Sequence, residues 1–547
     1  MLKRSHQGLL LALLVLGVAY VFAYHASEPF YNNDETRHLM TGVYFRDLLH
    51  DMPLRNLRGY TINYYLQHPA LGLLVWPPFF YIVEGLMMTL FGTSIIVSKV
   101  LVALFGVMAC VYLYKLVCLT HDATRAIIAV LFFGLAPLFF ELAHYVMLEV
   151  PTLALFLAAI YHFLAFLEKE RRRDLVLAAL FSALAALTRF DAAHLVLLFL
   201  IFVFVRKRWK LLWRRDVLVI AALAFLVILP FYALSAYQVG WLHFRSATET
   251  VLPSYPGFLS LRRLLFYPSN LRWQIGIVAL IPALIGLAFG LTKEGRKSAW
   301  PYLAIIITTY VVFTPIGELE PRHSFYWIPA FPFFAADGVA LVARLLRMPR
   351  LYLPLAATLL AGLMWFTLSR PLPVLRGYEE AASFVAANTT DSPFCLFMGR
   401  LNGDFIYQLR HLDPQRKLWV LRADKLLFSG LIADEHKSLA DDQQVLDTIY
   451  KYDPEFIVVE EPQSADTSDP DPEEQERKES EKRIRDLLSN HPERFSLEKS
   501  IPLMSDDPQY KGMTLKVFRN TFRNENPERR LEFNILMLRR SIQTDIP

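Results

Sequence analysis

The polar residues best suited to chemistry stand in one short run, Asn33-Asp34-Glu35-Thr36-Arg37, directly after the first apolar stretch. A carboxylate beside a hydroxyl or amine nucleophile can accept its proton, and Arg37, three residues from Asp34, can hold that carboxylate ionised. A helical pattern of apolar residues follows, so Asp34 is equally suited to cap that helix at its N-terminus. The spacing alone supports both interpretations.

Three further polar groups stand between apolar runs. Glu149 lies just before Pro151, which starts a helix, so this acid is either a structural helix-end residue or a functional one. Arg189 and Asp191 are spaced to form a local ion pair or to contact a substrate. Arg322 enters an otherwise apolar helix and therefore requires an anionic partner. Because a guanidinium binds phosphate oxygens in a bidentate manner, a lipid phosphate is a suitable partner.

Membrane helices are the elements that must position these groups. Apolar residues make up 54% of the 547-residue chain and aromatic residues 14%, which is more than a soluble core needs. The apolar runs fill residues 8–369, whereas the rest has the composition of a soluble protein. The net charge of +5 gives no argument for a nucleic-acid partner. Three cysteines cannot form a disulfide framework.

Basic loops indicate the topology, because positively charged loops face the cytoplasm. The first run, 8–26, is either a span or a cleaved leader, and the lack of a small-residue cleavage site favours a span with its N-terminus inside. The basic clusters all lie inside only if residues 74–91 form an interfacial or re-entrant segment, introduced by Trp76-Pro77-Pro78. Eleven spans then place the C-terminal domain outside. The four clusters are 168–174, 206–216, 293–297 and 344–350.

The same topology gathers the polar segments on the outer face, where we expect the chemistry. This one-sided placement favours a membrane enzyme. A polytopic transporter is the alternative, although its ionisable residues would lie near the middle of the bilayer. A membrane-anchored receptor is a third possibility, but it leaves the acids of the first loop unexplained. The outer segments are 27–73, 144–150, 189–191, 238–272 and 316–322.

Residues 371–547 predict a small extracytoplasmic α/β domain. Short apolar runs at 394–398, 418–421 and 456–460 suit buried strands, and they alternate with helical patterns, so we expect parallel pairing. The acidic, proline-bearing stretch 463–481 predicts a flexible loop. We expect this domain to be noncatalytic and to help receive the acceptor or cover the site.

The order of these features resembles the GT-C type glycosyltransferases that use polyprenyl-phosphate sugars, a group that contains bacterial aminoarabinose transferases and protein O-mannosyltransferases. The run Asp34-Glu35-Thr36-Arg37 is similar to the Asp-Glu motif of the family's first periplasmic loop. Trp76-Pro77-Pro78 and Leu90-Phe91-Gly92 resemble its Lys-Pro-Pro and Leu-Phe-Gly pair. The tryptophan departs from the usual lysine, which leaves His68 or Arg189 to supply that cation.

Three later positions extend the resemblance, which covers about residues 8–370. Glu149 stands where the family often has an external acid after the third span. Thr188-Arg189 replaces its usual Thr-Lys, and Arg322-His323, followed by two prolines, resembles its Arg-Tyr segment. The resemblance favours a catalytic role for Asp34 over a capping role.

The resemblance implies an α-helical polytopic glycosyltransferase of the plasma (inner) membrane, with a membrane domain over residues 1–370 that includes the external catalytic loop 27–73. It would move a sugar from a polyprenyl-phosphate donor to a lipid, glycan or protein acceptor of the cell envelope, with inversion and with Asp34 as general base. No metal or other cofactor is expected. The sugar, the acceptor and the oligomeric state are not specified. The other implied site residues are Glu35 beside the base and, for substrate contact, Arg37, His68, Glu149, Arg189, Arg322 and His323.

Overall fold

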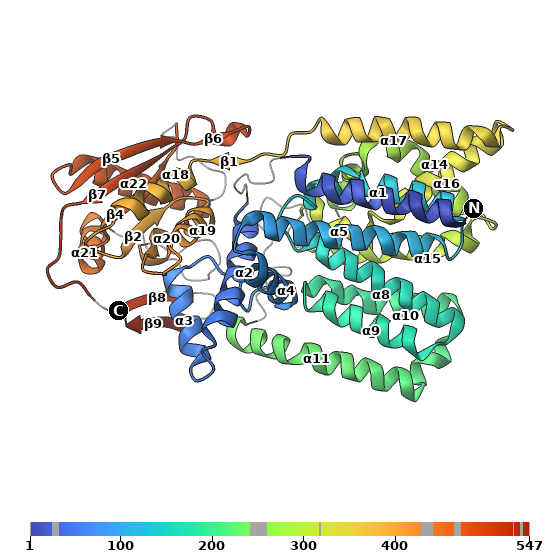
Figure 1. Ribbon diagram of the computed structural model, residues 1–547, viewed down its shortest axis with the longest axis horizontal. Coiled ribbons are helices and arrows are strands. Elements are labelled where there is room, and N and C mark those ends of the chain that lie inside the picture. Colours follow the sequence, from blue (N-terminus) through green and yellow to red (C-terminus); the bar gives the residue numbers. More distant parts are fainter. Residues whose placement is uncertain are drawn as a thin grey trace.

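The protein consists of a long helical bundle and a C-terminal α/β domain, with three helices between them (Figure 1). The N-terminus lies at the end of the bundle that is farthest from the C-terminal domain. The architecture expected from the sequence is therefore confirmed. The computed structural model describes residues 2–24, 32–240, 260–316, 319–427, 441–463, 472–528, 530–535 and 540–545.

The bundle is built from apolar helices that pack closely through small residues. A Cβ atom on Gly286 would lie 1.9 Å from the carbonyl oxygen of Phe334, so α14 and α16 approach backbone to backbone. Helices α11 and α17 lie at the periphery (Figure 1), where their apolar side chains are largely exposed, as on a lipid-facing surface. The helices of the bundle are α1 (Leu2–Phe22), α5 (Ile95–Val117), α6 (Ala123–Gly134), α7 (Pro137–Leu142), α8 (Glu149–Lys169), α9 (Arg172–Ala186), η1 (Phe190–His194), α10 (Leu195–Val205), η2 (Trp209–Trp213), α11 (Arg215–Val239), α13 (Leu261–Leu271), η3 (Arg272–Gly276), α14 (Ile277–Gly290), α15 (Arg296–Phe313), η4 (Pro321–Trp327), α16 (Ala330–Leu345), η5 (Pro349–Leu351) and α17 (Tyr352–Leu368).

Five helices among the described residues are long and apolar enough to cross a membrane. Helices η4 and α16, which are bent by 59° at a short break, pass the same test together. Others are shorter than the roughly 20 residues that a single crossing needs, such as α6 with 12 residues and α9 with 15. The chain is thus a polytopic helical membrane protein, while the count of eleven spans stays a prediction.

The four basic clusters meet at one end of the bundle, the end at which the N-terminus lies (Figure 1). Arg206 of the second cluster forms an ion pair with Glu168 of the first, 3.0 Å away. The guanidinium of Arg206 also lies 5.4 Å from the ring centroid of Trp300, next to the third cluster. Arg344 of the fourth cluster lies 5.6 Å from the ring of Phe289 at the end of α14. This common end is what the predicted topology requires, and its cytoplasmic location stays a prediction.

Three helices lie between the bundle and the C-terminal domain (Figure 1). Helix α4 has 13 residues and is about 20 Å long, too short to cross the hydrocarbon, which agrees with the interfacial prediction for residues 74–91. It packs against α2, because a Cβ on Gly42 would lie 2.2 Å from Oε2 of the fully buried Glu84. The three helices are α2 (Asn33–Asp51), α3 (Leu57–Gln67) and α4 (Phe79–Phe91).

The C-terminal domain contains a five-stranded sheet of order β3-β2-β4-β7-β5. β2 (Phe394–Met398) pairs in parallel with both β3 (Trp419–Arg422) and β4 (Phe456–Glu461), as predicted. β7 (Thr514–Asn520) pairs antiparallel with β4 and with β5 (Phe495–Pro502), and these two strands were not predicted. The other elements around this sheet are α18 (Tyr378–Asn388), α19 (Asn402–Leu412), α20 (Ala423–Leu426), α21 (Asp442–Tyr452), η6 (Pro508–Tyr510) and the antiparallel pair β1 (Leu375–Arg376) and β6 (Met504–Ser505).

Helix α22 (Pro472–Asn490) shows that the predicted flexible loop at 463–481 was wrong over its second half. The loop prediction rested on acidic composition and proline content. The helix forms because Ile484 and Leu488, at helical spacing, are buried in the core of the domain and anchor it. Residues 464–471 of the predicted loop lie outside the described residues.

Part of the first outer loop shares the core of the C-terminal domain. Leu66 of α3 is fully buried in a cluster with strand residues such as Leu396 and Leu421. The antiparallel hairpin of β8 (Arg530–Ile535) and β9 (Arg540–Asp545) also contacts α3. Helix α3 therefore packs as a component of this domain, although it precedes most of the bundle in the chain.

Candidate active site

The first turn of α2 carries the acidic pair, and Asn32 caps the helix. The Asn32 side chain accepts a hydrogen bond from the backbone N–H of Asp34, with an N–O distance of 2.8 Å. The interpretation of Asp34 as the N-cap is therefore wrong, because the cap lies two residues earlier. The Asp34 carboxylate instead makes its contacts with side chains.

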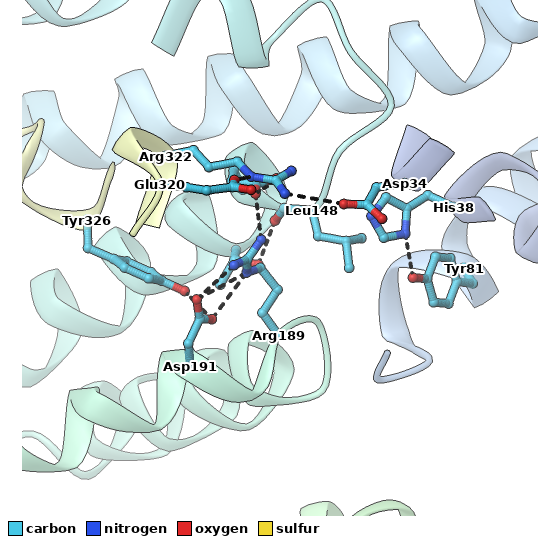
Figure 2. Close-up of polar contacts among 11 residues, drawn as sticks. Asp34, His38, Tyr81, Leu148, Arg189, Asp191, Glu320, Arg322 and Tyr326 are labelled. Carbon is cyan, nitrogen blue, oxygen red and sulfur yellow. Dashed lines mark hydrogen bonds and ion pairs between the residues drawn. The ribbon is translucent and has the colours of Figure 1, made fainter. Parts of the chain in front are cut away.

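The carboxylate of Asp34 contacts two guanidinium groups, one of which, that of Arg322, is shown in Figure 2. Nη2 of Arg322 is 3.3 Å from its Oδ2, and Nη1 of Arg37 is 3.5 Å from its Oδ1. Burial by itself raises the pKa of Asp34, but the positive charges of Arg322 and Arg37 outweigh burial and hold this pKa below its usual value. The side chain is 25% exposed, so Asp34 is an ionised and accessible proton acceptor at neutral pH.

Arg322, in the short helix η4, is surrounded by three carboxylates. Besides Asp34, its Nε contacts Glu320 (Figure 2), and its Nη1 lies 3.9 Å from Oε1 of Glu149. The structure therefore supplies the anionic partner that the sequence required of this arginine. With 23% of its side chain exposed, Arg322 can reach a further anion from solvent or lipid. Glu318, in the same segment, lies outside the described residues.

Arg189 is buried and fully engaged within the protein. Its Nη1 donates to Oε1 of Glu149 at 2.7 Å, and its Nε and Nη2 donate to the carboxylate of Asp191 at 3.2 and 2.9 Å. Asp191 also accepts a hydrogen bond from the hydroxyl of Tyr326 at 2.8 Å (Figure 2). The predicted local ion pair is present, and it extends to Glu149 at the start of α8. Arg189 thereby braces α8 against the segment that precedes η1.

Trp76, which stands where relatives carry lysine, lies beside this brace. The guanidinium carbon of Arg189 is 5.7 Å from the centroid of the Trp76 ring and 5.9 Å from that of Phe325, so the cation is held between aromatic rings. Trp76 also stacks on Phe190, with centroids 6.1 Å apart. The positive charge at this corner comes from Arg189.

Two other acids predicted for the site are more deeply buried than Asp34. Glu35 and Glu149 are each 1% exposed. Oε1 of Glu35 accepts a hydrogen bond from the backbone N–H of Val146 at 3.1 Å, which ties α2 to the segment before α8. The structure thus brings Glu149 into the cluster around Arg322 and directs Glu35 toward the backbone of the bundle.

His38 and Tyr81 border the site, and sequence reasoning missed both. Nδ1 of His38 lies 2.7 Å from the hydroxyl of Tyr81 in α4 (Figure 2). Burial lowers the pKa of His38 to about 4, so its ring is neutral at physiological pH. The spacing of four residues from Asp34 places His38 on the same face of α2, and this was the signal that could have identified it.

The two predicted histidine contacts differ in their locations. His68 ends α3 with its ring 5.1 Å from that of Tyr64, and burial followed by the nearby charge of Arg410 lowers its pKa to about 3. The structure does not bring His68 into the cluster around Asp34. His323 follows Arg322 in η4, donates its backbone N–H to the carbonyl oxygen of Glu320 at 3.1 Å and lies within electrostatic reach of the site's charged groups.

Within the described residues, no group of three or more His, Cys, Asp or Glu side chains is arranged to hold a metal ion. The carboxylates of Asp34, Glu149 and Asp191 are each engaged by arginine. The chemistry available to these residues is proton acceptance by a carboxylate next to a cation that binds anions. The expected independence of metals stays a prediction.

Comparisons with known proteins are consistent with this geometry. Residues 75–233 match the family model described as dolichyl-phosphate-mannose-protein mannosyltransferase. No curated protein matches the sequence. Among solved structures, ArnT from Cupriavidus metallidurans bound to undecaprenyl phosphate is similar with a TM-score of 0.61 and 14% identity, over 95% of this chain and 98% of that chain. The apo oligosaccharyltransferase of Archaeoglobus fulgidus is similar with a TM-score of 0.54 and 13% identity, over 83% and 69%.

The family match covers one segment of the chain, whereas the structural likeness covers most of it. The matched segment includes α4, the start of α8 and Arg189, which form one side of the site. At 13–14% identity, the likeness to solved structures establishes the fold, and it extends over nearly the whole chain. The chain thus shares the fold of these membrane-protein structures, and one segment of it matches the mannosyltransferase family model.

Proposed function

We propose that the chain transfers a sugar from a polyprenyl-phosphate donor to an acceptor on the outer face of the membrane. The observation that carries the proposal is the partly exposed carboxylate of Asp34, 3.3 Å from the partly exposed guanidinium of Arg322. A base and an anion-binding cation side by side are what this transfer needs, because a nucleophile loses a proton while a phosphate leaves. The likeness to an ArnT structure that contains undecaprenyl phosphate supports this donor class.

In the proposed reaction, Asp34 takes the proton from the acceptor hydroxyl or amine as that group attacks the anomeric carbon. The new bond forms at the anomeric carbon while the bond to the phosphate oxygen breaks, and the electron pair stays on the departing lipid phosphate. One displacement inverts the anomeric configuration. The low pKa of Asp34 in the absence of substrate means that it starts as a carboxylate, ready to accept the proton.

Arg322 is the proposed contact of the donor phosphate. Its side chain is 23% exposed, whereas that of Arg189 is 8% exposed and contacts two carboxylates. Bidentate binding of phosphate by Arg322 would draw this cation away from Asp34 and stabilise the charge that develops on the leaving group. Arg37, with 36% of its side chain exposed beside Asp34, is a second candidate contact.

The proposal that the site opens on the outer face rests on which groups lie at each end of the bundle. The site lies at the end next to the C-terminal domain, opposite the N-terminus, and the four basic clusters lie at the N-terminal end (Figure 1). Because basic loops face the cytoplasm, this arrangement supports a site that opens to the extracytoplasmic side.

Donor recognition can be tested by thermal unfolding of the purified protein in lipid nanodiscs. Undecaprenyl phosphate at about 100 times its dissociation constant should stabilise the wild-type protein by about 2.7 kcal/mol, because it binds only the folded state. Undecaprenol, which lacks the phosphate, should stabilise it much less. Arg322→Lys should reduce the effect of the phosphate, since lysine loses the bidentate fork.

Arg350→Lys provides the matched control, because Arg350 is an exposed arginine at the opposite end of the bundle. It should respond to undecaprenyl phosphate as the wild-type protein does. Equal stabilisation by the alcohol and the phosphate, or an unchanged response in Arg322→Lys, would contradict the assigned donor site. Mass spectrometry of envelope glycans, lipids and proteins from cells with and without the protein would then identify the acceptor and the sugar.

A further inference from the structure

The C-terminal domain contacts the start of α2, next to the proposed base. Gly403, in the first turn of α19, lies so close to α2 that a Cβ at this position would be 2.0 Å from Oγ1 and 2.9 Å from Cβ of Thr36. Only glycine permits this approach. Thr36 is fully buried and β-branched, so it has little freedom to move aside. Asp34 lies two residues before it.

The same domain holds the other end of α2 through buried charges. Arg410, at the end of α19, pairs with Asp47 at 2.6 Å, and their side chains are 7% and 2% exposed. The hydroxyl of Tyr64 donates to the same carboxylate at 2.7 Å. Asp47 is 13 residues from Asp34, about 20 Å along the helix, so this ion pair is remote from the proposed chemistry. Helices α19 and α2 therefore meet at both ends.

The partner of the base is held by a different part of the molecule. Arg322 belongs to η4, which leads into α16 of the bundle, while α2 packs against α4 and against α19 of the C-terminal domain and is tied to the bundle through Glu35. The 3.3 Å contact between Asp34 and Arg322 thus joins η4 to a helix that the C-terminal domain also holds. A shift of α2 relative to α19 would change its length.

We infer that α19 is a positioning element for the active site, in which Gly403 and Arg410 set the distance between Asp34 and Arg322. This inference rests on the proposed role of Asp34 as the base. The C-terminal domain then contributes to turnover without touching the substrate, because it fixes the helix that carries the base. A displacement of about 1 Å between reacting groups can cost a hundredfold in rate.

Three variants test this role in a transfer assay with a polyprenyl-phosphate sugar. Gly403→Ala should push the start of α2 away and lower kcat by roughly 10- to 100-fold, because the base is misplaced. The donor KM should stay close to wild type, since Arg322 is held by the bundle. Adding Thr36→Ala removes the 2.0 Å contact with Oγ1 but keeps the 2.9 Å contact with Cβ, so the double variant should recover part of the kcat. Thr36→Ala alone should be mild.

Gly290→Ala is the matched control, because it introduces a steric clash far from α2. A Cβ there would lie 2.8 Å from Cε1 of Phe334, so this variant should lose stability but keep its kcat per folded molecule. If Gly403→Ala does not fold, Arg410→Gln and Arg410→Lys replace it, and kcat should fall with Gln and be partly kept with Lys.

Unchanged kcat in Gly403→Ala, or in Arg410→Gln where that variant is used, would overturn the inference. So would a loss that Thr36→Ala does not reduce, or an equal loss in Gly290→Ala, because both would indicate general damage to the fold. Absence of transfer by the wild-type protein would instead contradict the proposed function itself.

Discussion

Replacing Arg189 by methionine should destabilise the protein more than it weakens donor binding. The guanidinium neutralises Glu149 and Asp191, whose side chains are 1% and 9% exposed. Without it, Asp191 keeps only the hydroxyl of Tyr326 among its direct partners described above, and Glu149 keeps Arg322 at 3.9 Å. Methionine has a similar length and can pack against the neighbouring aromatic rings, so the lost charge dominates the effect.

The magnitude follows from the burial of these carboxylates. Removing one partner of a buried ion pair costs about 3–5 kcal/mol, since the other charge stays desolvated. Two carboxylates lose a partner here, which would cost about 6–10 kcal/mol, but the hydrogen bond that Asp191 keeps retains about 1.5–3 kcal/mol, so we expect a total of about 3–8 kcal/mol. Arg189→Lys keeps the charge and loses the fork, and its cost should be intermediate.

Thermal or denaturant unfolding in nanodiscs measures this cost, and the response to undecaprenyl phosphate is measured on the folded fraction. The double variant Glu149→Gln with Arg189→Met should recover part of the stability, because it removes one of the two carboxylate charges that lost their arginine partner. An unfolding transition like that of the wild-type protein, together with a lost donor response, would refute the structural brace and make Arg189 a ligand contact.

Three further predictions concern other residues. Arg322→Lys should lower transfer by about 10²-fold at normal stability, and wild-type kinetics would contradict its role at the leaving phosphate. Burial raises the pKa of Asp404 well above its usual value. The protonated side chain therefore contributes its full share to the free energy of unfolding below the ordinary carboxyl pKa of about 4. That contribution is lost as pH rises through the raised pKa. Asp404→Asn should therefore unfold at a higher temperature than wild type at pH 8 but not near pH 4, and equal shifts at both would argue against a buried neutral acid. Gly42→Ala should cost about 1–3 kcal/mol, because its Cβ would meet Glu84 at 2.2 Å, and unchanged unfolding would show that α4 moves freely.

Sequence patterns predicted those parts of the architecture whose formation depends mainly on one physical rule. Apolar runs and basic loops indicated the bundle and the common end of its basic clusters, and short apolar runs predicted β2, β3 and β4. The motif order located the acidic pair at the start of α2 and the arginine of η4 beside it. The antiparallel strands β5 and β7 were missed because their partly exposed faces dilute the apolar signal.

The roles of individual side chains depended on tertiary contacts that the sequence does not contain. Nothing in the spacing indicates that Arg189 is enclosed while Arg322 is exposed, because this depends on how α8 and η4 meet. His68 has the chemistry of a cationic contact, but α3 packs into the C-terminal domain and carries it away from the site. His38 was missed because its role depends on the hydroxyl of Tyr81 from another helix.

The most direct test of the account is the transfer rate of Asp34→Asn with saturating donor and acceptor. Asparagine preserves the size of the side chain, and Asn32 caps α2, so the variant should fold and insert normally. As the proposed base, Asp34 should contribute roughly 10²- to 10⁴-fold, and the account predicts a loss of that size with undiminished binding of undecaprenyl phosphate. Near-normal turnover in a folded Asp34→Asn protein would contradict it.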